Sequence, residues 1–147
     1  MASHHCKAVL VTCMDFRLHQ RADGRNYTAD FIRRLRIDCD LITRGGSIQD
    51  LVRSKEGSGF DKSLLRDSKV SAKLHQVETV YLINHEDCGA YGEMDFSSRE
   101  EEIAQHEEDL KKAREIINEE FPDVKVELFF GDLKEGTSDE YSFRKVE

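Results

Sequence analysis

The sequence predicts an α/β domain in which a mainly parallel β-sheet is flanked by helices. Short apolar runs rich in β-branched residues recur along the chain, and the segments between them often carry the spacing of amphipathic helices. Strands that alternate with helices are typical of parallel sheets with right-handed crossovers. The length of 147 residues suits one domain with a sizeable core, so we expect a single domain over residues 1–147.

The first half of the chain predicts two strands and two helices. Residues 7–12 form an apolar run and should be a strand that is buried on both faces. Thr28 is placed to cap a short helix, and a second strand is expected over residues 40–43. Ser47 follows a pair of glycines and is expected to cap the next helix.

The second half continues the alternation of helices and strands. A helix over residues 61–76 should lead into a strand over residues 79–84. Ser97 and Ser98 begin the clearest helix of the chain, and a strand over residues 124–130 follows it. Numbering the strands in chain order, we expect the order 2-1-3-4 across the sheet, with an extra edge strand from Tyr141 onward.

Composition and charge exclude several classes of function. The formal net charge is −8, whereas non-specific nucleic-acid binding requires a basic face. The chain has neither the long apolar run of a membrane span nor a signal-peptide pattern, so we expect a cytoplasmic protein. Cysteines in such a compartment are thiols, metal ligands or catalytic groups rather than disulfides. The cysteines are Cys6, Cys13, Cys39 and Cys88.

Metal-competent side chains follow two of the expected strands. Cys13 comes directly after the first strand, and His85 and Cys88 come after the third. In open α/β sheets, ligands bind beyond the carboxyl ends of the strands, so these three residues should converge on one crevice. Two thiolates and one imidazole form an ordinary catalytic zinc set, in which a fourth position stays open.

Asp15 and Arg17 should complete this site. In an extended segment, residues 13, 15 and 17 project to the same side, which places a carboxylate and a guanidinium beside the metal. The two groups can pair in a bidentate fork that holds the carboxylate in place and ionised. Two thiolates neutralise the formal charge of Zn²⁺, so water at this site needs the help of such a carboxylate to ionise near neutral pH.

These residues resemble the motifs of the β-class carbonic anhydrases. The similarity covers most of the chain, and its specific part is a pair of motifs, each of which follows a strand. The motifs are Cys13-x-Asp15-x-Arg17 and His85-x-x-Cys88-Gly89. The resemblance implies reversible hydration of carbon dioxide to bicarbonate and a proton, with zinc on Cys13, His85 and Cys88.

The resemblance also implies roles for the neighbouring residues and for a partner. Asp15 and Arg17 would act as a catalytic pair, and in some members of the family the aspartate moves onto the metal as a fourth ligand and closes the site. The smallest unit of the family is a dimer, so a homodimer or a higher homo-oligomer is expected. Two alternatives stay open: hydrolysis of carbonyl sulfide or carbon disulfide at the same site, and a zinc-binding homologue without activity that serves as a binding or regulatory module.

This sequence departs from the family at several positions. The family's N-terminal helical arm is not expected, because the first strand begins near Lys7. Ser47 closes a stretch that is usually Arg-Asn-Ala-Gly, and Asn84 stands where a glycine usually precedes the histidine. Glu86 is interpreted as a solvated loop acid, and His106 as a histidine on a helix surface.

Overall fold

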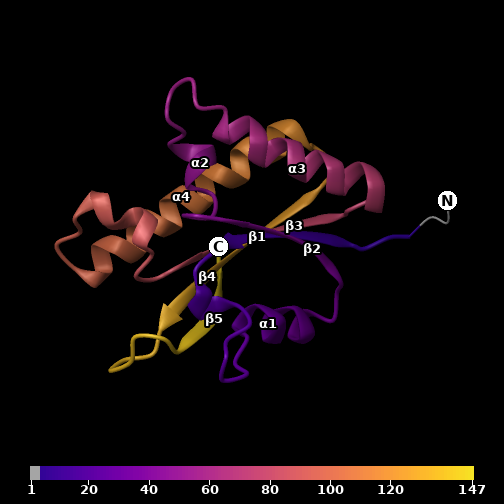
Figure 1. Ribbon diagram of the computed structural model, residues 1–147. Coiled ribbons are helices and arrows are strands. Elements are labelled where there is room, and N and C mark those ends of the chain that lie inside the picture. The colour runs from indigo at the N-terminus through magenta and orange to yellow at the C-terminus, as the bar shows by residue number, and fades with distance from the viewer. Residues whose placement is uncertain (1–3) are drawn as a thin grey trace.

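The computed structural model describes residues 4–147, and the first three residues of the expected domain 1–147 lie outside the described part. Its centre is a five-stranded sheet with the order β2-β1-β3-β4-β5 (Figure 1). The four strands from β1 to β4 are parallel to their neighbours, and β5 pairs antiparallel with β4. The predicted order 2-1-3-4 with an extra edge strand is therefore confirmed. The strands are β1 (Ala8–Cys13), β2 (Cys39–Arg44), β3 (Thr79–His85), β4 (Lys125–Leu133) and β5 (Tyr141–Val146).

Helices cover both faces of the sheet. In Figure 1, α1 lies below the sheet, and α2, α3 and α4 lie above it. Within residues 4–147, none of the helices is both long and apolar enough to cross a membrane. The α-helices are α1 (Tyr27–Leu35), α2 (Gln49–Val52), α3 (Phe60–His75) and α4 (Arg99–Glu120), and the two 3-10 helices are η1 (Phe16–Leu18) and η2 (Gly89–Met94).

The two central strands feed a separate core on each face of the sheet. Val9 and Val11 of β1 point toward α2, α3 and α4, where they pack with Leu82 and Leu110. Ala8 and Leu10 alternate with them and belong to the second core, which surrounds Phe31 of α1 and also includes Tyr81 and Ile83. Because every residue of β1 is buried, the strand reads as a continuous apolar run, as predicted.

The helix starts show one confirmed cap and two wrong ones. Thr28 does not cap α1 but lies inside it, because the N-cap residue is Asn26. Ser98 caps α4 through its side chain, which accepts a hydrogen bond from the backbone N–H of Glu101 at 3.1 Å. Ser47 does not cap α2, whose N-cap position is Ile48. Ser47 instead takes a left-handed backbone conformation with φ of 53° and donates its hydroxyl to the carbonyl oxygen of Ile83 at 2.6 Å. A bond across the fold to β3 has replaced the local bond that the sequence pattern predicts.

Gly131 of β4 offers a test of the packing behind the end of β3, where it pairs with His85. A Cβ atom at this position would lie 2.7 Å from Cε1 of Phe143 and 3.4 Å from Cβ of His85. We therefore expect Gly131→Ala to lower the free energy of unfolding by about 1–3 kcal/mol through overpacking, as measured by urea denaturation. The control is Gly92→Ala, because a Cβ at Gly92 meets nothing within 4 Å. Equal stability of both variants would contradict this expectation and show that the Phe143 ring moves aside without loss of stability.

Candidate metal centre

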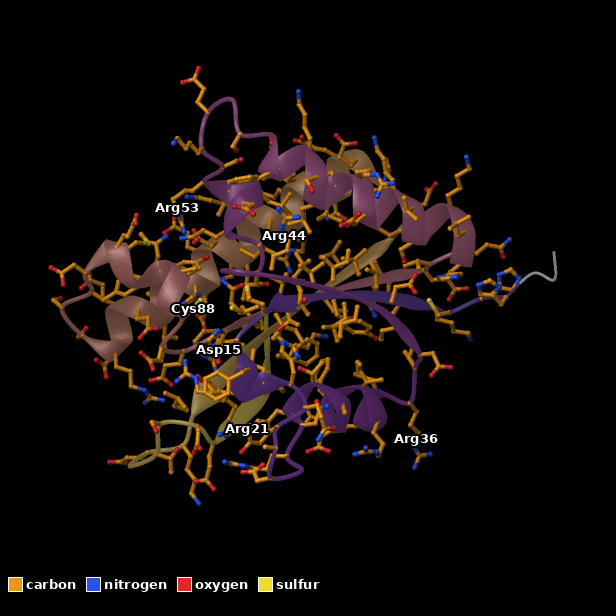
Figure 2. All side chains as sticks on the ribbon, viewed as in Figure 1. Asp15, Arg21, Arg36, Arg44, Arg53 and Cys88 are labelled. Atoms are coloured by element: carbon orange, nitrogen blue, oxygen red, sulfur yellow. The ribbon has the colours of Figure 1, made fainter. Side chains whose placement is uncertain are left out.

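The three predicted ligands lie together at the carboxyl ends of β1 and β3. Cys13 is the last residue of β1, His85 is the last residue of β3, and Cys88 is the N-cap residue of η2. Their ligand atoms all lie within 4.8 Å of one another, and all three residues are buried. Figure 2 shows Cys88 close to Asp15 at this end of the sheet. The crossover topology has thus brought the side chains together as the sequence predicts.

The two thiols form a close buried pair. The Sγ atoms of Cys13 and Cys88 are 3.8 Å apart. The hydrogen bond from Cys88 lowers the pKa of the Cys13 thiol to about 4, with further help from His85. The same pairing, together with burial, raises the pKa of the Cys88 thiol. One thiolate therefore forms readily, and loss of the second proton requires a nearby positive charge, which a bound cation supplies.

His85 is held in the orientation of a metal ligand. Its Nδ1–H donates to the carbonyl oxygen of Glu86 at 2.9 Å, and the hydroxyl of Tyr141 donates to the same oxygen at 3.0 Å. This bond leaves the lone pair on Nε2, which is buried and has no hydrogen-bond partner among residues 4–147. An outer partner that fixes the tautomer of a histidine is typical of metal sites. The free Nε2 and the two thiols fit a divalent transition metal ion.

Asp15 and Arg17 pair beside this cluster. Nη2 of Arg17 lies 2.7 Å from Oδ2 of Asp15, and the backbone N–H of Arg17 donates to Oδ1 at 2.9 Å. Burial opposes ionisation of Asp15, but the hydrogen bonds from Arg17 outweigh it and lower the pKa of the carboxyl. Oδ2 lies 3.9 Å from Nε2 of His85, so an ionised carboxylate faces the unpartnered nitrogen.

The Arg17 guanidinium also reaches two other loops. Nη1 donates to a carboxylate oxygen of Asp87 and to the carbonyl oxygen of Ser138, both at 2.9 Å. Nη2 donates to the carbonyl oxygen of Asp87 at 2.8 Å. The guanidinium carbon lies 5.5 Å from the centre of the Tyr141 ring. Three segments that are far apart in the sequence therefore meet on one side chain.

Glu86 corrects an interpretation made from the sequence. It is buried rather than a solvated loop acid. Its carboxylate pairs with Arg99 and accepts a hydrogen bond from the backbone N–H of Leu133 at 2.7 Å. The pair ties the loop after β3 to the start of α4 and the end of β4. A glutamate between a histidine and an aspartate carries no local signal of such burial, because both of its partners are distant in the sequence.

A buried polar network lies behind the cluster, and the sequence did not predict it. Nδ2 of Asn84 donates to the hydroxyl of Tyr91 at 3.2 Å and to Nδ1 of His106 at 3.0 Å. The Tyr91 hydroxyl donates to Asp109 at 2.7 Å, and Arg53 pairs with the same carboxylate. Asn84 stands at one of the positions where this sequence departs from the β-class pattern, and that departure is the only sequence signal for the network.

His106 is fully buried in this network, so its interpretation as a helix-surface residue is wrong. Burial lowers the pKa of its imidazole to about 3. An unfolded histidine has a pKa of about 6.5, so the unfolded chain takes up a proton between these values and the folded chain does not. His106 should therefore contribute to a loss of stability as the pH falls below 6.5.

The pH dependence of unfolding tests this burial. Between pH 7.5 and pH 5, His106 should account for about 2 kcal/mol of lost unfolding free energy. We expect His106→Gln to be less stable than the wild type at pH 7.5. Its free energy of unfolding should fall less than that of the wild type between pH 7.5 and pH 5, as measured by urea denaturation at both pH values. The control is His5→Gln, since His5 is exposed. The same pH dependence in His106→Gln and wild type would contradict the buried neutral imidazole.

A pocket of about 450 Å³ adjoins the cluster on the side of Cys88. Tyr91 and Phe96 contribute aromatic side chains to its lining, and Arg99 and Glu102 contribute charged ones. Of the three candidate ligands, Cys88 is the one that lines this pocket.

Comparisons with known proteins agree with this architecture. Residues 3–137 match a family model described as "Putative carbonic anhydrase". An uncharacterized protein of Rickettsia bellii (strain RML369-C) is 30% identical over 132 residues, which are 86% of this chain and 76% of that protein. An uncharacterized protein of Rickettsia conorii (strain ATCC VR-613 / Malish 7) is 28% identical over 132 residues, or 86% of this chain and 67% of that protein.

A solved structure shares the fold. The crystal structure of carbonic anhydrase from Streptococcus mutans matches with a TM-score of 0.59 and 14% sequence identity, over 99% of this chain and 84% of that chain. The family match over residues 3–137 includes all four parallel strands and the three clustered side chains. The chain therefore belongs to the family described as "Putative carbonic anhydrase" and is a β-carbonic-anhydrase-like member of it.

Proposed function

We propose that this protein catalyses the zinc-dependent, reversible hydration of carbon dioxide to bicarbonate and a proton. One observation carries the proposal: the unpartnered Nε2 of His85 lies among the thiols of Cys13 and Cys88, with an ionised carboxylate 3.9 Å from it. Membership of the carbonic anhydrase family supports the same reaction. Carbon dioxide is small and neutral, which suits a site whose three candidate ligands are buried.

The protein's own residues divide into ligands and a positioning pair. Cys13, His85 and Cys88 would hold zinc, and the Glu86 carbonyl would keep the proton of His85 on Nδ1, away from the metal. Zinc, when bound, supplies the Lewis acidity that makes water a nucleophile near neutral pH. Asp15 Oδ2 would accept a hydrogen bond from the attacking water and orient it.

Arg17 is proposed to set the state of Asp15. Its hydrogen bonds to both carboxylate oxygens lower the pKa of Asp15 and fix its direction. In a closed state, Asp15 would release Arg17 and become a fourth ligand of the metal. The balance between these two arrangements would then decide whether water can occupy the fourth ligand position.

A stopped-flow hydration assay on protein of measured zinc content tests the reaction. We expect carbon dioxide hydration well above the buffer rate, with higher activity at alkaline pH if the closed state is populated. Turnover of carbonyl sulfide or carbon disulfide without carbon dioxide hydration would favour the sulfur-analogue hydrolase. Zinc binding with none of these activities at any pH would overturn the proposal and favour a binding or regulatory module.

Two substitutions separate metal binding from catalysis. Asp15→Asn should keep the zinc content and lower the hydration rate at least about 100-fold, because the amide cannot serve as the same acceptor. Cys88→Ser should lose one equivalent of zinc and the activity together. Zinc analysis and stopped-flow rates on the same samples check both expectations.

Matched controls exist for each substitution. Asp30→Asn removes an exposed carboxylate that pairs with Arg33 on α1, and Cys39→Ser changes a half-buried thiol outside the centre. Both controls should keep full activity and metal content. Full activity in Asp15→Asn would remove this carboxylate from the mechanism, and unchanged zinc in Cys88→Ser would remove Cys88 from the ligand set.

We also propose a homodimer, in line with the resemblance to the β-class enzymes. Met14 and Phe16 flank Asp15, and their side chains are 64% and 68% exposed. Apolar side chains of this size at the mouth of a site are typical of surfaces that a partner covers.

Sedimentation measures the oligomeric state directly. The wild type should sediment at twice the 17.0 kDa of one chain, or at a higher multiple. Phe16→Glu should shift the equilibrium toward monomer, whereas the control Leu74→Glu, at an exposed apolar position on α3, should not. A wild type that stays monomeric at all concentrations would contradict the dimer.

A further inference from the structure

A second group of metal-competent side chains lies at the opposite end of the sheet. Cys6 precedes β1, Asp40 is the second residue of β2, and His75 is the last residue of α3. Their ligand atoms all lie within 4.8 Å of one another. Since Ala8 of β1 pairs with Cys39 of β2, both strands begin at this corner. The group shares no residue with the centre formed by Cys13, His85 and Cys88.

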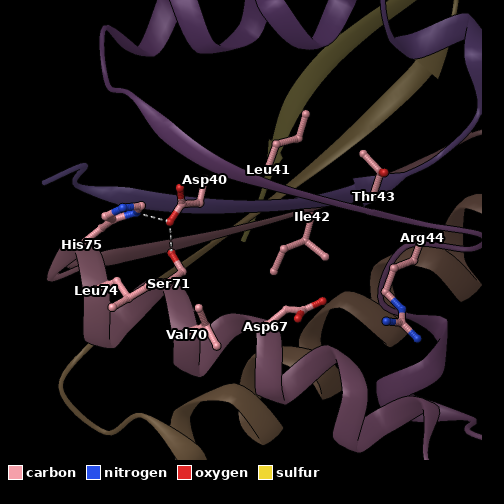
Figure 3. A pocket seen from close by; sticks show the side chains of 10 residues that line it. All are labelled: Asp40, Leu41, Ile42, Thr43, Arg44, Asp67, Val70, Ser71, Leu74 and His75. Atoms are coloured by element: carbon pink, nitrogen blue, oxygen red, sulfur yellow. Dashed lines mark hydrogen bonds and ion pairs between the residues drawn. The ribbon is translucent and has the colours of Figure 1, made fainter. Parts of the chain in front are cut away.

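Asp40 organises the polar contacts of this corner. Its Oδ2 accepts hydrogen bonds from Oγ of Ser71 and from Nδ1 of His75, both at 2.6 Å, as Figure 3 shows. The Cys6 thiol donates to the carbonyl oxygen of Ala8 at 3.3 Å. A pocket of about 510 Å³ between β2 and α3 begins beside Asp40 and His75. An ion can therefore reach the group from solvent.

The charges of this corner favour a cation. Although burial opposes it, hydrogen bonds from Ser71 and His75 lower the pKa of Asp40, so the carboxylate is ionised near neutral pH. His75 ends α3, a helix of 16 residues, and its carbonyl end carries the partial negative charge of the helix dipole. The carboxylate of Asp40 and the carbonyl end of α3 therefore both contribute negative potential at this corner.

We propose that Cys6, Asp40 and His75 bind a second divalent transition metal ion of the zinc class. A thiolate, an imidazole and a carboxylate suit zinc, cobalt or nickel, whereas calcium and magnesium prefer oxygen ligands alone. The fourth position is open to water or to His4, whose ring centre lies 4.7 Å from that of His75.

Metal binding requires a simple movement of protons. The Cys6 thiol releases its proton to solvent and coordinates as a thiolate. Coordination through Nδ1 of His75 moves the ring proton to Nε2 and replaces the hydrogen bond to Asp40. The bound ion would join the segment before β1, the start of β2 and the end of α3. By mass action, it would raise the stability of the fold.

Metal stoichiometry tests the second site without reference to activity. Metal-free, reduced protein is dialysed against Zn²⁺ and, separately, against Co²⁺, and the bound metal is counted per chain. We expect two equivalents for the wild type and for the control Cys39→Ser. His75→Ala and Cys6→Ser should each bind one equivalent fewer, and their melting temperature should rise less when Zn²⁺ is added.

The outcomes distinguish this site from the proposed catalytic centre. If the catalytic centre does not bind metal, Cys88→Ser keeps the wild-type stoichiometry while His75→Ala still loses one equivalent. A wild type that binds one equivalent, lost in Cys88→Ser, would overturn the second site. Unchanged stoichiometry in folded His75→Ala would overturn it as well. If one variant fails to fold, the metal equivalents bound by the wild type and by the other variant still test the second site.

Discussion

The pairing of β1 with β3 is the constraint on which the candidate metal centre depends. The two strands run parallel from Ala8 opposite Thr79 to Val11 opposite Leu82, so their carboxyl ends lie side by side. This register brings Cys13 within reach of Cys88, although 75 positions separate them in the sequence. A buried apolar strand cannot slip by one residue without turning its core side chains to the wrong face, so the same packing that stabilises the sheet fixes the donor atoms.

Around this register, charged and polar side chains hold the loops in addition to the apolar packing of Leu18, Tyr91 and Tyr141. Arg17 joins the segment after β1 to Asp87 and to the loop at Ser138, and the pair of Glu86 and Arg99 joins the loop after β3 to α4. Asn84 anchors the other side of His85 through the buried network. Asn84 and Glu86 are the sequence neighbours of His85, and Asp87 is the neighbour of Cys88. Rigidity of the donor set therefore rests on outer partners, as in metal sites generally.

The fold and the clustering of Cys13, His85 and Cys88 are predictable from the sequence because their signals are local or topological. Apolar runs mark β1 and β3, and the rule that ligands bind at strand ends brings Cys13 and His85 together. The failures have the opposite character. Ser47, Glu86 and His106 were misjudged because their partners are distant in the sequence, and residue type alone does not distinguish a buried histidine from an exposed one. In each case, hydrogen bonds to residues distant in the sequence fix the position of the side chain, and local preference does not.

The central claim is that Cys13, His85 and Cys88 hold one zinc ion at the ends of β1 and β3. X-ray absorption at the zinc edge, on His75→Ala protein loaded with one equivalent, measures this directly, because the substitution removes the proposed second site. The account predicts two sulfur neighbours at about 2.3 Å and two nitrogen or oxygen neighbours at about 2.0 Å. A spectrum with nitrogen and oxygen neighbours only, or with a single sulfur, would contradict it.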